Sequence, residues 1–381
     1  MNIHPFLQQL LAGQAVEWKP LGEVAYLTRG RVISKQYLDE NRGDYPVYSS
    51  QTVNNGEIGK IDTFDFDGEY VSWTTDGANA GTVFYRTGKF SITNVCGLIQ
   101  IQDLSKLDYK FLFYWLSISA KHHVYSGMGN PKLMSNQMSK IKIPIPPLSV
   151  QTKIAQILDA FTAITAELTA ELSMRNKQYQ YYRDKLLSEN ELAKVGFEWK
   201  SLGEVLIRTK GTKITAGQMK ELHKENAPLK IFAGGKTFAL VDFDDIPQKD
   251  INTNPSVIVK SRGIIEFEYY DKPFSHKNEM WSYYSDNENI LIKFVYYFLK
   301  SKESYFQQLG SKMQMPQIAT PDTDKFLIPI PPLSAQTKIV QILDKFDTLT
   351  RSISDGLPRE IELRQQQYEY YREMLLGFER E

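Results

Sequence analysis

The longest regular pattern in the chain is a stripe of apolar residues at alternating three- and four-residue spacing, and it occurs twice. The first stripe consists of Ile154, Ile157, Leu158, Phe161, Ile164, Leu168, Leu172, Tyr179, Tyr182 and Leu186. The second consists of Ile339, Ile342, Phe346, Leu349, Ile353, Ile361, Tyr368, Tyr371 and Leu375. This spacing predicts two long helices with a coiled-coil seam. We expect the two stripes to bury each other, although two separate amphipathic helices on two cores would show the same pattern.

The predicted helices have recognisable ends. The segment "IPIPPLS" precedes both stripes, and its prolines favour an extended chain. Ser149 and Ser334 close this segment and are the candidate N-caps. Within the second stripe, Gly356 and Pro358 do not suit a continuous helix, so we expect a kink or break there.

The stretches before the two stripes have a different pattern. Short runs of β-branched and aromatic residues, broken by Gly and Asp, predict β-rich modules in residues 25–142 and 206–327. Each module ends in a more helical segment, at 107–126 and 287–309, and each of these is followed by a polar loop.

The chain is a tandem duplication of similar frames around dissimilar contents. "IPIPPLSVQTKIAQILDAF" (Ile143–Phe161) returns as "IPIPPLSAQTKIVQILDKF" (Ile328–Phe346). "EWKPLGEV" at 17–24 returns as "EWKSLGEV" at 198–205, and "QYQYYRDKLL" at 178–187 returns as "QYEYYREMLL" at 367–376. We therefore expect one scaffold with two independently specified modules, divided as 1–145 (module), 146–190 (helix), 191–330 (module) and 331–381 (helix).

Composition adds constraints. The chain has 45 basic and 45 acidic residues, so contact with nucleic acid would need a local basic patch. Cys96 is the only cysteine, which excludes an internal disulfide and a cysteine-based metal cluster. The N-terminus lacks the pattern of a secretory signal, and the most apolar segment, at 290–300, is too short and too charged to span a membrane. We expect a cytoplasmic protein.

The segments "IPIPPLSxQTKIxQILD", "QYxYYR" and "EWKxLGEV" resemble the specificity subunit of Type I restriction–modification enzymes, over essentially the whole chain. The resemblance implies an α+β fold: two mixed, β-rich target-recognition domains separated by two long antiparallel coiled-coil helices, with pseudo-twofold symmetry. Each domain would read one half of a bipartite double-stranded DNA target. The subunit would have no catalytic activity and no cofactor of its own. It would recruit two modification subunits, which methylate adenine, and restriction subunits; S-adenosylmethionine, ATP and Mg²⁺ would belong to these partners.

Base edges are read by polar and basic side chains on exposed loops. Such loops are predicted at 28–31, 48–56, 73–81 and 127–137, and in the second module at 208–213, 232–237, 274–281 and 310–317. For any single residue, an ordinary solvated turn is the competing explanation. The candidate DNA-binding residues are Arg29, Arg31, Ser50, Gln51, Asn54, Asn55, Thr74, Asn79, Asn130, Lys132, Arg208, Lys210, Lys213, Lys236, His276, Lys277, Lys312, Gln314 and Gln317.

Two of these candidates occupy matching places. Arg29 and Lys210 lie at the same distance from the repeated "LGEV", and so do Gly30 and Gly211. This equivalence favours both loops as DNA-contacting segments over the other loops.

The first stripe contains a smaller repeat, "TAELTAEL", whose spacer positions are Thr165, Leu168, Thr169 and Leu172. Sixteen residues lie between Phe161 and Gln178, and 20 lie between Phe346 and Gln367. Four residues of helix add ~6 Å and ~40° beyond a full turn. In the resembling family the number of such units is associated with the length of the unread DNA spacer, so we expect these residues to act as a ruler. A stretch that merely favours helix is the alternative.

Several other chemistries find little support. "GGKT" at 234–237 lacks the earlier glycine of a phosphate-binding loop, because Lys230 occupies that place. The tyrosines of "QYQYYR" could stack on bases, but their seam spacing favours packing. His122 and His123 are adjacent, so they do not share a helix face as metal ligands would. No methylation motif appears, which argues against an enzyme; a coiled-coil adaptor that binds proteins rather than DNA is the remaining alternative.

Overall fold

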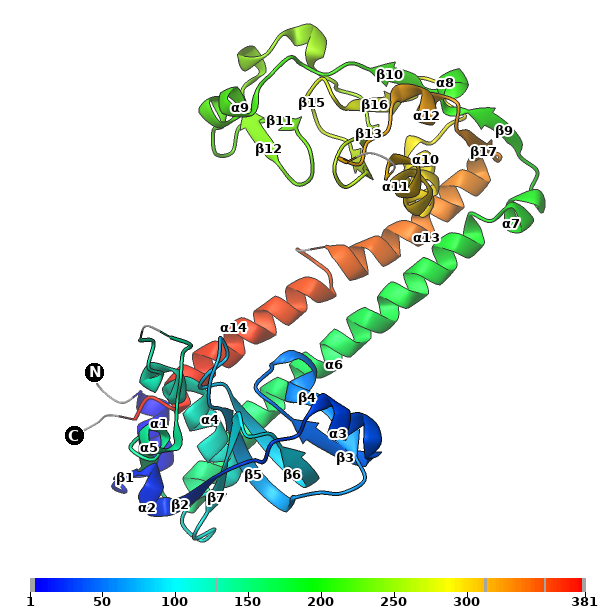
Figure 1. Cartoon of the computed structure of the whole chain (residues 1–381). Coiled ribbons are helices and arrows are strands. Elements are labelled where there is room, and N and C mark those ends of the chain that lie inside the picture. Colours follow the sequence, from blue (N-terminus) through cyan, green and yellow to red (C-terminus); the bar gives the residue numbers. More distant parts are fainter. Residues whose placement is uncertain (1–3, 128, 312–313, 353, 379–381) are drawn as a thin grey trace. The chain divides into compact units, whose positions relative to one another are not determined.

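The computed structural model describes residues 4–127, 129–311, 314–352 and 354–378, which form two compact units (Figure 1). The first unit contains residues 1–167 and 361–381, and the second contains residues 168–360. Each unit thus contains one β-rich module, the start of the helix that follows it and the end of the helix from the other repeat. This partition differs from a division into modules and helices, and the boundaries at 145, 190 and 330 stay predictions.

The first unit is built on a sheet with strand order β2-β7-β5-β6-β3-β4, in which β3 and β6 run parallel. Helix α4 packs on this sheet, because Phe111 and Leu112 share a buried core with Val71, Trp73 and Ile99. The elements are α1 (Pro5–Leu11), β1 (Glu17–Pro20), α2 (Leu21–Val24), β2 (Ala25–Arg29), α3 (Lys35–Glu40), β3 (Arg42–Tyr48), β4 (Glu57–Ile61), β5 (Phe66–Thr74), β6 (Val83–Ile92), β7 (Cys96–Ile101), α4 (Tyr109–Ser119), α5 (Ser135–Met138), β8 (Lys142–Ile145), the start of α6 (Leu148–Leu186) and most of α14 (Leu357–Leu375).

The second unit has one sheet with strand order β10-β16-β13-β14 and a smaller one with order β12-β11-β15. Helix α10 covers the larger sheet, since Phe294 and Val295 share a core with Val257, Val259 and Trp281. The elements are the end of α6, α7 (Glu189–Ala193), β9 (Glu198–Ser201), α8 (Leu202–Val205), β10 (Ile207–Thr209), α9 (Ala216–Leu222), β11 (Leu229–Phe232), β12 (Phe238–Val241), β13 (Ser256–Lys260), β14 (Glu266–Tyr270), β15 (Phe274–His276), β16 (Trp281–Tyr284), α10 (Ile292–Ser301), α11 (Glu303–Gly310), α12 (Thr320–Asp324), β17 (Leu327–Ile330) and α13 (Leu333–Arg351). The prediction of two β-rich modules, each with a helical segment near its C-terminal end, is confirmed.

The two ends of each module pair with each other. β1 runs antiparallel to β8 with Trp18 opposite Pro144, and β9 runs antiparallel to β17 with Trp199 opposite Pro329. The repeated "EWK" and "IPI" segments are therefore the two strands of one closing ribbon. The module inserted between them can change while the ribbon stays the same.

The repeated "SxQT" sequence places a buried amide at the start of each long helix. Gln151 accepts a hydrogen bond from the Asp108 backbone N–H at 2.9 Å and donates to the carbonyls of Pro146 (2.7 Å) and Lys106 (2.8 Å). Gln336 repeats this set: it accepts from Leu291 N–H at 2.8 Å and donates to the carbonyls of Pro331 (2.8 Å) and Asn289 (2.9 Å). Both side chains are fully buried. Each amide thus ties the proline turn to the start of the module's own helix.

The repeated "QILD" sequence supplies a second tie to the same helices. Asp159 accepts from Lys110 and, at 2.7 Å, from Tyr114 OH on α4. Asp344 accepts from Lys293 at 2.9 Å and from Tyr297 OH on α10. Burial and the neighbouring carboxylate raise the pKa of Tyr297, so its phenol stays protonated and donates.

The helix that leaves each module packs against the tail of the other repeat's helix. In the first unit Phe161 stacks on Tyr371 of α14, with ring centroids 5.0 Å apart and planes at 25°. In the second unit Phe346 stacks on Tyr182 of α6, at 5.6 Å and 24°. Phe161 and Phe346 are equivalent positions of the repeat, and so are Tyr182 and Tyr371. The same Phe–Tyr contact therefore forms in both units, each time between the Phe of one repeat and the Tyr of the other. The prediction that the two stripes pack against each other is confirmed at these two contacts, although Tyr182 remains 41% exposed.

The seam is not uniformly buried, and the helix ends correct one prediction. Ile164 remains 42% exposed and Ile342 40%, while Ile353 lies outside the described residues. The expectation that Ser149 and Ser334 are N-caps is wrong: α6 and α13 begin at Leu148 and Leu333, two residues earlier than such caps would place them and directly after the last proline of each segment. Pro332 is itself the N-cap, with its φ fixed by the ring.

The expected break in the second stripe is confirmed, because α13 ends at Arg351 and α14 begins at Leu357. Gly356 lies against the helix end so closely that a Cβ there would be 2.4 Å from the Thr348 carbonyl oxygen. A side chain at this position would therefore require the backbone at the end of α13 to shift.

Replacing the buried amide tests the tie at the start of α13. We expect Gln336→Leu to lower the free energy of unfolding by about 3 kcal/mol, because it leaves the Leu291 N–H and two carbonyls without partners. Gln341→Leu, at an exposed position of the same helix, is the control and should change little. Chemical denaturation followed by circular dichroism measures both; equal midpoints would contradict the structural role.

Candidate nucleic-acid interface

The predicted DNA-contacting loops of the first unit meet around the β6–β7 turn. A Cβ at Gly30 would be 2.0 Å from the Ile92 carbonyl oxygen, so only glycine allows this crossing. Arg31 then forms a bridge with Thr93, whose hydroxyl donates to Ser49 Oγ at 3.0 Å. Thr75 N–H donates to the Val95 carbonyl at 3.0 Å. The loops at 28–31, 48–56 and 73–81 therefore share one turn.

The fourth loop of the first unit docks on the third. Gly77 N–H donates to the Pro131 carbonyl at 3.0 Å, and Leu133 N–H donates to the Thr75 carbonyl at 2.8 Å. Lys132 forms a bridge with Asp76. All four predicted loops of this unit are thus contiguous.

Several candidate side chains already have protein partners. Arg29 donates to Thr75 Oγ1 at 2.9 Å and to the Asn94 carbonyl at 2.7 Å. Arg31 pairs with Asp65 at 3.0 Å and lies over the ring of Tyr37. These contacts hold each guanidinium in one place, which is how a contact residue is preorganised.

The candidates of the first unit differ in their access to solvent. Arg29, Asn54, Asn55, Asn130 and Lys132 are exposed, whereas Arg31, Ser50, Gln51 and Asn79 are half-buried. Thr74 is fully buried, and its Oγ1 accepts from Thr82 N–H at 3.1 Å. Thr74 therefore has a structural place in β5 and is not available to DNA in this structure.

A buried arginine, which the sequence analysis missed, holds the loop at 49–57. Arg86 is 3% exposed, lies over the rings of Tyr48 and Phe84, and donates to the Asn55 carbonyl at 2.8 Å and to Ser72 Oγ at 3.1 Å. Burial lowers the pKa of Arg86 to about 10, so it still carries its charge near neutral pH. The only feature of the sequence that could have indicated this role is the position of Arg86 in a predicted strand rich in aromatic residues.

This loop has an unusual backbone. Asn54 and Asn55 have φ of 51° and 53°, in the left-handed region, and Gly56 has φ of 82°. Asparagine tolerates this region better than other residues with a side chain. The arrangement presents two exposed amides side by side on a backbone fixed by Arg86.

The second unit repeats the glycine crossing with different side chains. A Cβ at Gly211 would be 2.2 Å from the His276 carbonyl oxygen, and Thr212 N–H donates to that oxygen at 2.8 Å. Lys277 N–H donates to the Phe232 carbonyl at 2.9 Å. The loops at 208–213, 232–237 and 274–281 therefore meet. The loop at 310–317 docks on the β13–β14 turn, where Gly263 N–H donates to the Pro316 carbonyl at 2.9 Å.

The candidates of the second unit are also placed differently. Arg208, Lys210, Lys213, Lys236 and Gln314 are exposed, Lys277 and Gln317 are half-buried, and Lys312 lies outside the described residues. Arg208 lies 3.4 Å from Asp324 and Lys277 lies 2.6 Å from Glu279. Which of these side chains contact DNA stays a prediction.

His276 is fully buried and is therefore not available to DNA in this structure. Its Nδ1–H donates to the Lys277 carbonyl at 3.1 Å, and Nε2 lies 3.2 Å from the Thr209 hydroxyl. Burial lowers the pKa of His276 and outweighs the attraction of Asp250 and Glu279. The neutral ring fastens β15 to β10.

The predicted spacer positions all lie on α6, which runs without interruption and contributes residues to both units. Leu168 and Leu172 are half-buried and Thr169 is exposed. The Thr165 hydroxyl donates to the Phe161 carbonyl at 2.9 Å. Helical structure at these positions is confirmed; their role as a ruler stays a prediction.

The structure also bears on the other chemistries. Gly234–Thr237 forms the turn before β12, so a strand follows it where a phosphate-binding loop would have a helix. Among the described residues, no cluster of three or more His, Cys, Asp or Glu side chains could hold a metal ion. No helix in the described part of the chain is long and apolar enough to cross a membrane.

Comparison with known proteins agrees with this architecture. The Type I restriction modification DNA specificity domain matches residues 15–174 and 194–363. The specificity subunit of the Type I restriction enzyme EcoR124I/EcoR124II from Escherichia coli is 34% identical over 99% of this chain and 98% of its own length. A putative type I specificity subunit from Mycoplasma pneumoniae is 33% identical over 93% of this chain and 95% of its own. The S subunit of a Type I restriction-modification system from M. genitalium has the same fold, with a TM-score of 0.69 at 18% identity over 95% of this chain and 97% of its own.

Two specificity domains on a duplicated frame define a DNA target-recognition protein. The chain belongs to the family of Type I restriction–modification specificity subunits. It is the non-catalytic subunit that determines which DNA target the enzyme recognises.

Removing the buried guanidinium tests the support of the 49–57 loop. We expect Arg86→Met to lower the free energy of unfolding by about 2 kcal/mol, because the Asn55 carbonyl and Ser72 lose a charged donor. The Ser49 amide, which donates to the Gly56 carbonyl at 2.9 Å, should then exchange its hydrogen faster. Lys89→Met, on an exposed position of the same strand, is the control. Unchanged exchange at Ser49 would show that Arg86 does not hold the loop.

His276 predicts an acid-sensitive second unit. The unfolded imidazole takes up a proton near pH 6.5, whereas the folded one resists it because its pKa is lowered. Stability is therefore complete above about pH 6.5 and falls below it, by at most about 1.4 kcal/mol per pH unit. His276→Asn should flatten this part of the profile, and His223→Gln, at an exposed position, should keep it. Denaturation midpoints between pH 5 and 8 decide the matter; parallel profiles for His276→Asn and the unchanged chain would contradict it.

Proposed function

We propose that each unit reads one half of a bipartite duplex DNA target, independently of the other. The observation that carries this proposal is the glycine crossing. At the same backbone crossing Arg31 bridges Thr93 in the first unit, and Thr212 bridges Lys277 in the second. Thr93 and Thr212 are buried, so the side chains within reach of DNA are Arg31 in one unit and Lys277 in the other. Because each base pair offers its own pattern of donors and acceptors in the major groove, different side chains at equivalent positions select different sequences.

The long helices set the gap between the two half-sites. Helix α6 is one continuous element of 39 residues, and the "TAEL" unit at 169–172 lies in its interior, so adding or removing such a unit alters the helix length and leaves both ends in place. A change in the length of a rigid helix changes the distance between its ends by a defined amount, whereas a flexible linker samples many end-to-end distances. Gly356 and Pro358 break the other helical segment, so α6 carries this function.

The partners follow from the family and from the repeat. Two similar frames present similar surfaces to two copies of one modification subunit, which methylates adenine with S-adenosylmethionine. Restriction subunits, with ATP and Mg²⁺, complete the enzyme. The relatives' names support this assignment, since one is the specificity subunit of a Type I restriction enzyme. The complex acts on DNA in the cytoplasm.

Mapping methylated adenines in cells that express this chain with its cognate modification subunit tests the proposal. We expect a split motif with a fixed gap. Deleting residues 169–172 should shorten that gap by one or two base pairs, because four helical residues span ~6 Å and a base pair rises about 3.4 Å. Both half-sites should remain the same.

A Glu171→Gln variant, which keeps the helix length, is the matched control and should leave the gap unchanged. A deletion that altered a half-site instead of the gap would contradict the spacer role. No methylation from an assembled complex would favour the adaptor alternative.

A further inference from the structure

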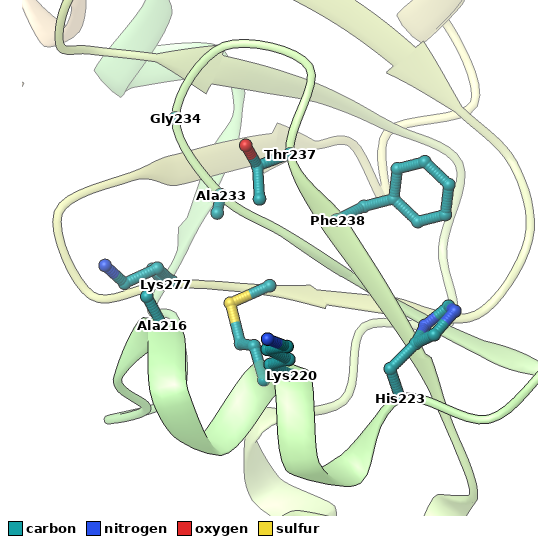
Figure 2. Close-up of a pocket in the computed structure, with 9 residues that line it drawn as sticks. Ala216, Lys220, His223, Ala233, Gly234, Thr237, Phe238 and Lys277 are labelled. Atoms are coloured by element: carbon teal, nitrogen blue, oxygen red, sulfur yellow. The ribbon is translucent and has the colours of Figure 1, made fainter.

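A cavity of about 530 Å³ opens on the second unit between α9 and the β11–β12 hairpin (Figure 2). Met219 and Ala233 are buried and form an apolar floor, and the half-exposed ring of Phe238 stands at one side. Lys220 comes from α9, His223 is the residue that caps its C-terminal end, Thr237 comes from the hairpin turn and Lys277 from the loop after β15. The cavity therefore has an apolar base and a polar rim drawn from three segments.

The polar rim consists almost entirely of hydrogen-bond donors. Lys220 and Lys277 are ammonium groups, and Thr237 is a hydroxyl that can donate. His223 Nδ1 accepts a hydrogen bond from Leu240 N–H at 3.0 Å, so the neutral ring carries its proton on Nε2. No carboxylate is among the lining residues that the structure describes. Such a rim matches a ligand that offers acceptors only.

One of the two ammonium groups of the rim is paired with a carboxylate, and the other has no partner among the described residues. Lys277 lies 2.6 Å from Glu279, but Lys220 makes no hydrogen bond or ion pair with any residue in the described ranges. Lys213, which borders an adjoining hollow together with Lys277, likewise has no such partner there.

We infer that this cavity holds a phosphodiester group of the target DNA, with the adjoining deoxyribose against Met219 and Phe238. Lys220 is the principal contact and Lys277 the second. The inference rests on the proposed function, and it assigns the cavity a positioning role at the second half-site.

A phosphate suits the cavity better than a base does. Arg, Asn and Gln, the planar side chains that grip a base edge with two hydrogen bonds, are absent from the described lining. Lysine is a point charge on a flexible stem, which suits phosphate oxygens. Phosphate contacts fix the orientation of a protein on DNA without reading its sequence.

The test uses the full chain assembled with its modification subunits and a duplex that carries the mapped methylation motif. Binding is measured by fluorescence anisotropy at several salt concentrations. We expect Lys220→Gln to weaken binding about 3- to 10-fold at about 100 mM salt and to reduce the slope of log K against log salt by about 1. The methylated motif should stay the same, and Lys220→Arg should restore affinity.

Lys272→Ala is the matched control, since Lys272 is exposed on the same unit and lines no part of the cavity. A second measurement replaces the phosphates around the second half-site one at a time by neutral methylphosphonates. The unchanged complex should lose affinity at one phosphate to which the Lys220→Gln complex is indifferent.

Each alternative outcome has a definite meaning. Equal affinity and slope for Lys220→Gln and the unchanged complex would overturn the inference. A changed second half-site would overturn it too, because Lys220 would then read a base. In both cases a split motif made by the unchanged complex would leave the proposed function standing. Absence of any split motif would overturn both.

Discussion

Both units depend on the contact between the start of a long helix and the module's own helix. Gln151 and Gln336 are fully buried amides, and each has its carbonyl and its amino group satisfied by the proline turn and by the residues at the start of the module's helix. A buried amide with a missing partner would cost about 1–3 kcal/mol, so the geometry around it has little freedom. Asp159 and Asp344 lie further along the same two long helices. Their carboxylates accept hydrogen bonds from the module's own helix and so fix the same pair of elements a second time.

This rigid frame allows the module contents to vary. The closing ribbon joins the two ends of each module, and the module's helix is held by the glutamine and aspartate of the repeated phrase. Neither contact involves the loops that carry the candidate DNA-binding residues. A change in the loops can therefore alter recognition without loosening the support.

The exchanged seam adds a second constraint. Phe161 packs on Tyr371 and Phe346 on Tyr182, so each unit is completed by a segment from the other repeat. Met374 and Leu375 are buried in the core of the first unit although they lie near the end of the chain. Each unit therefore contains residues from both repeats, and the last helix is part of the core of the first unit.

The sequence by itself determined the duplicated frame, the helical stripes, the break at Gly356 and Pro358, and the β-rich character of both modules. These features depend on local backbone preferences and on periodicity, which neighbouring residues fix. It did not determine which polar residues face outward: Thr74 and His276 are buried, and Arg86 supports a loop from inside the sheet. It also missed the cavity beside α9, whose walls come from segments as far apart as Lys220 and Lys277. Only the tertiary structure decided these, because burial and the meeting of distant side chains depend on how strands and loops pack in space.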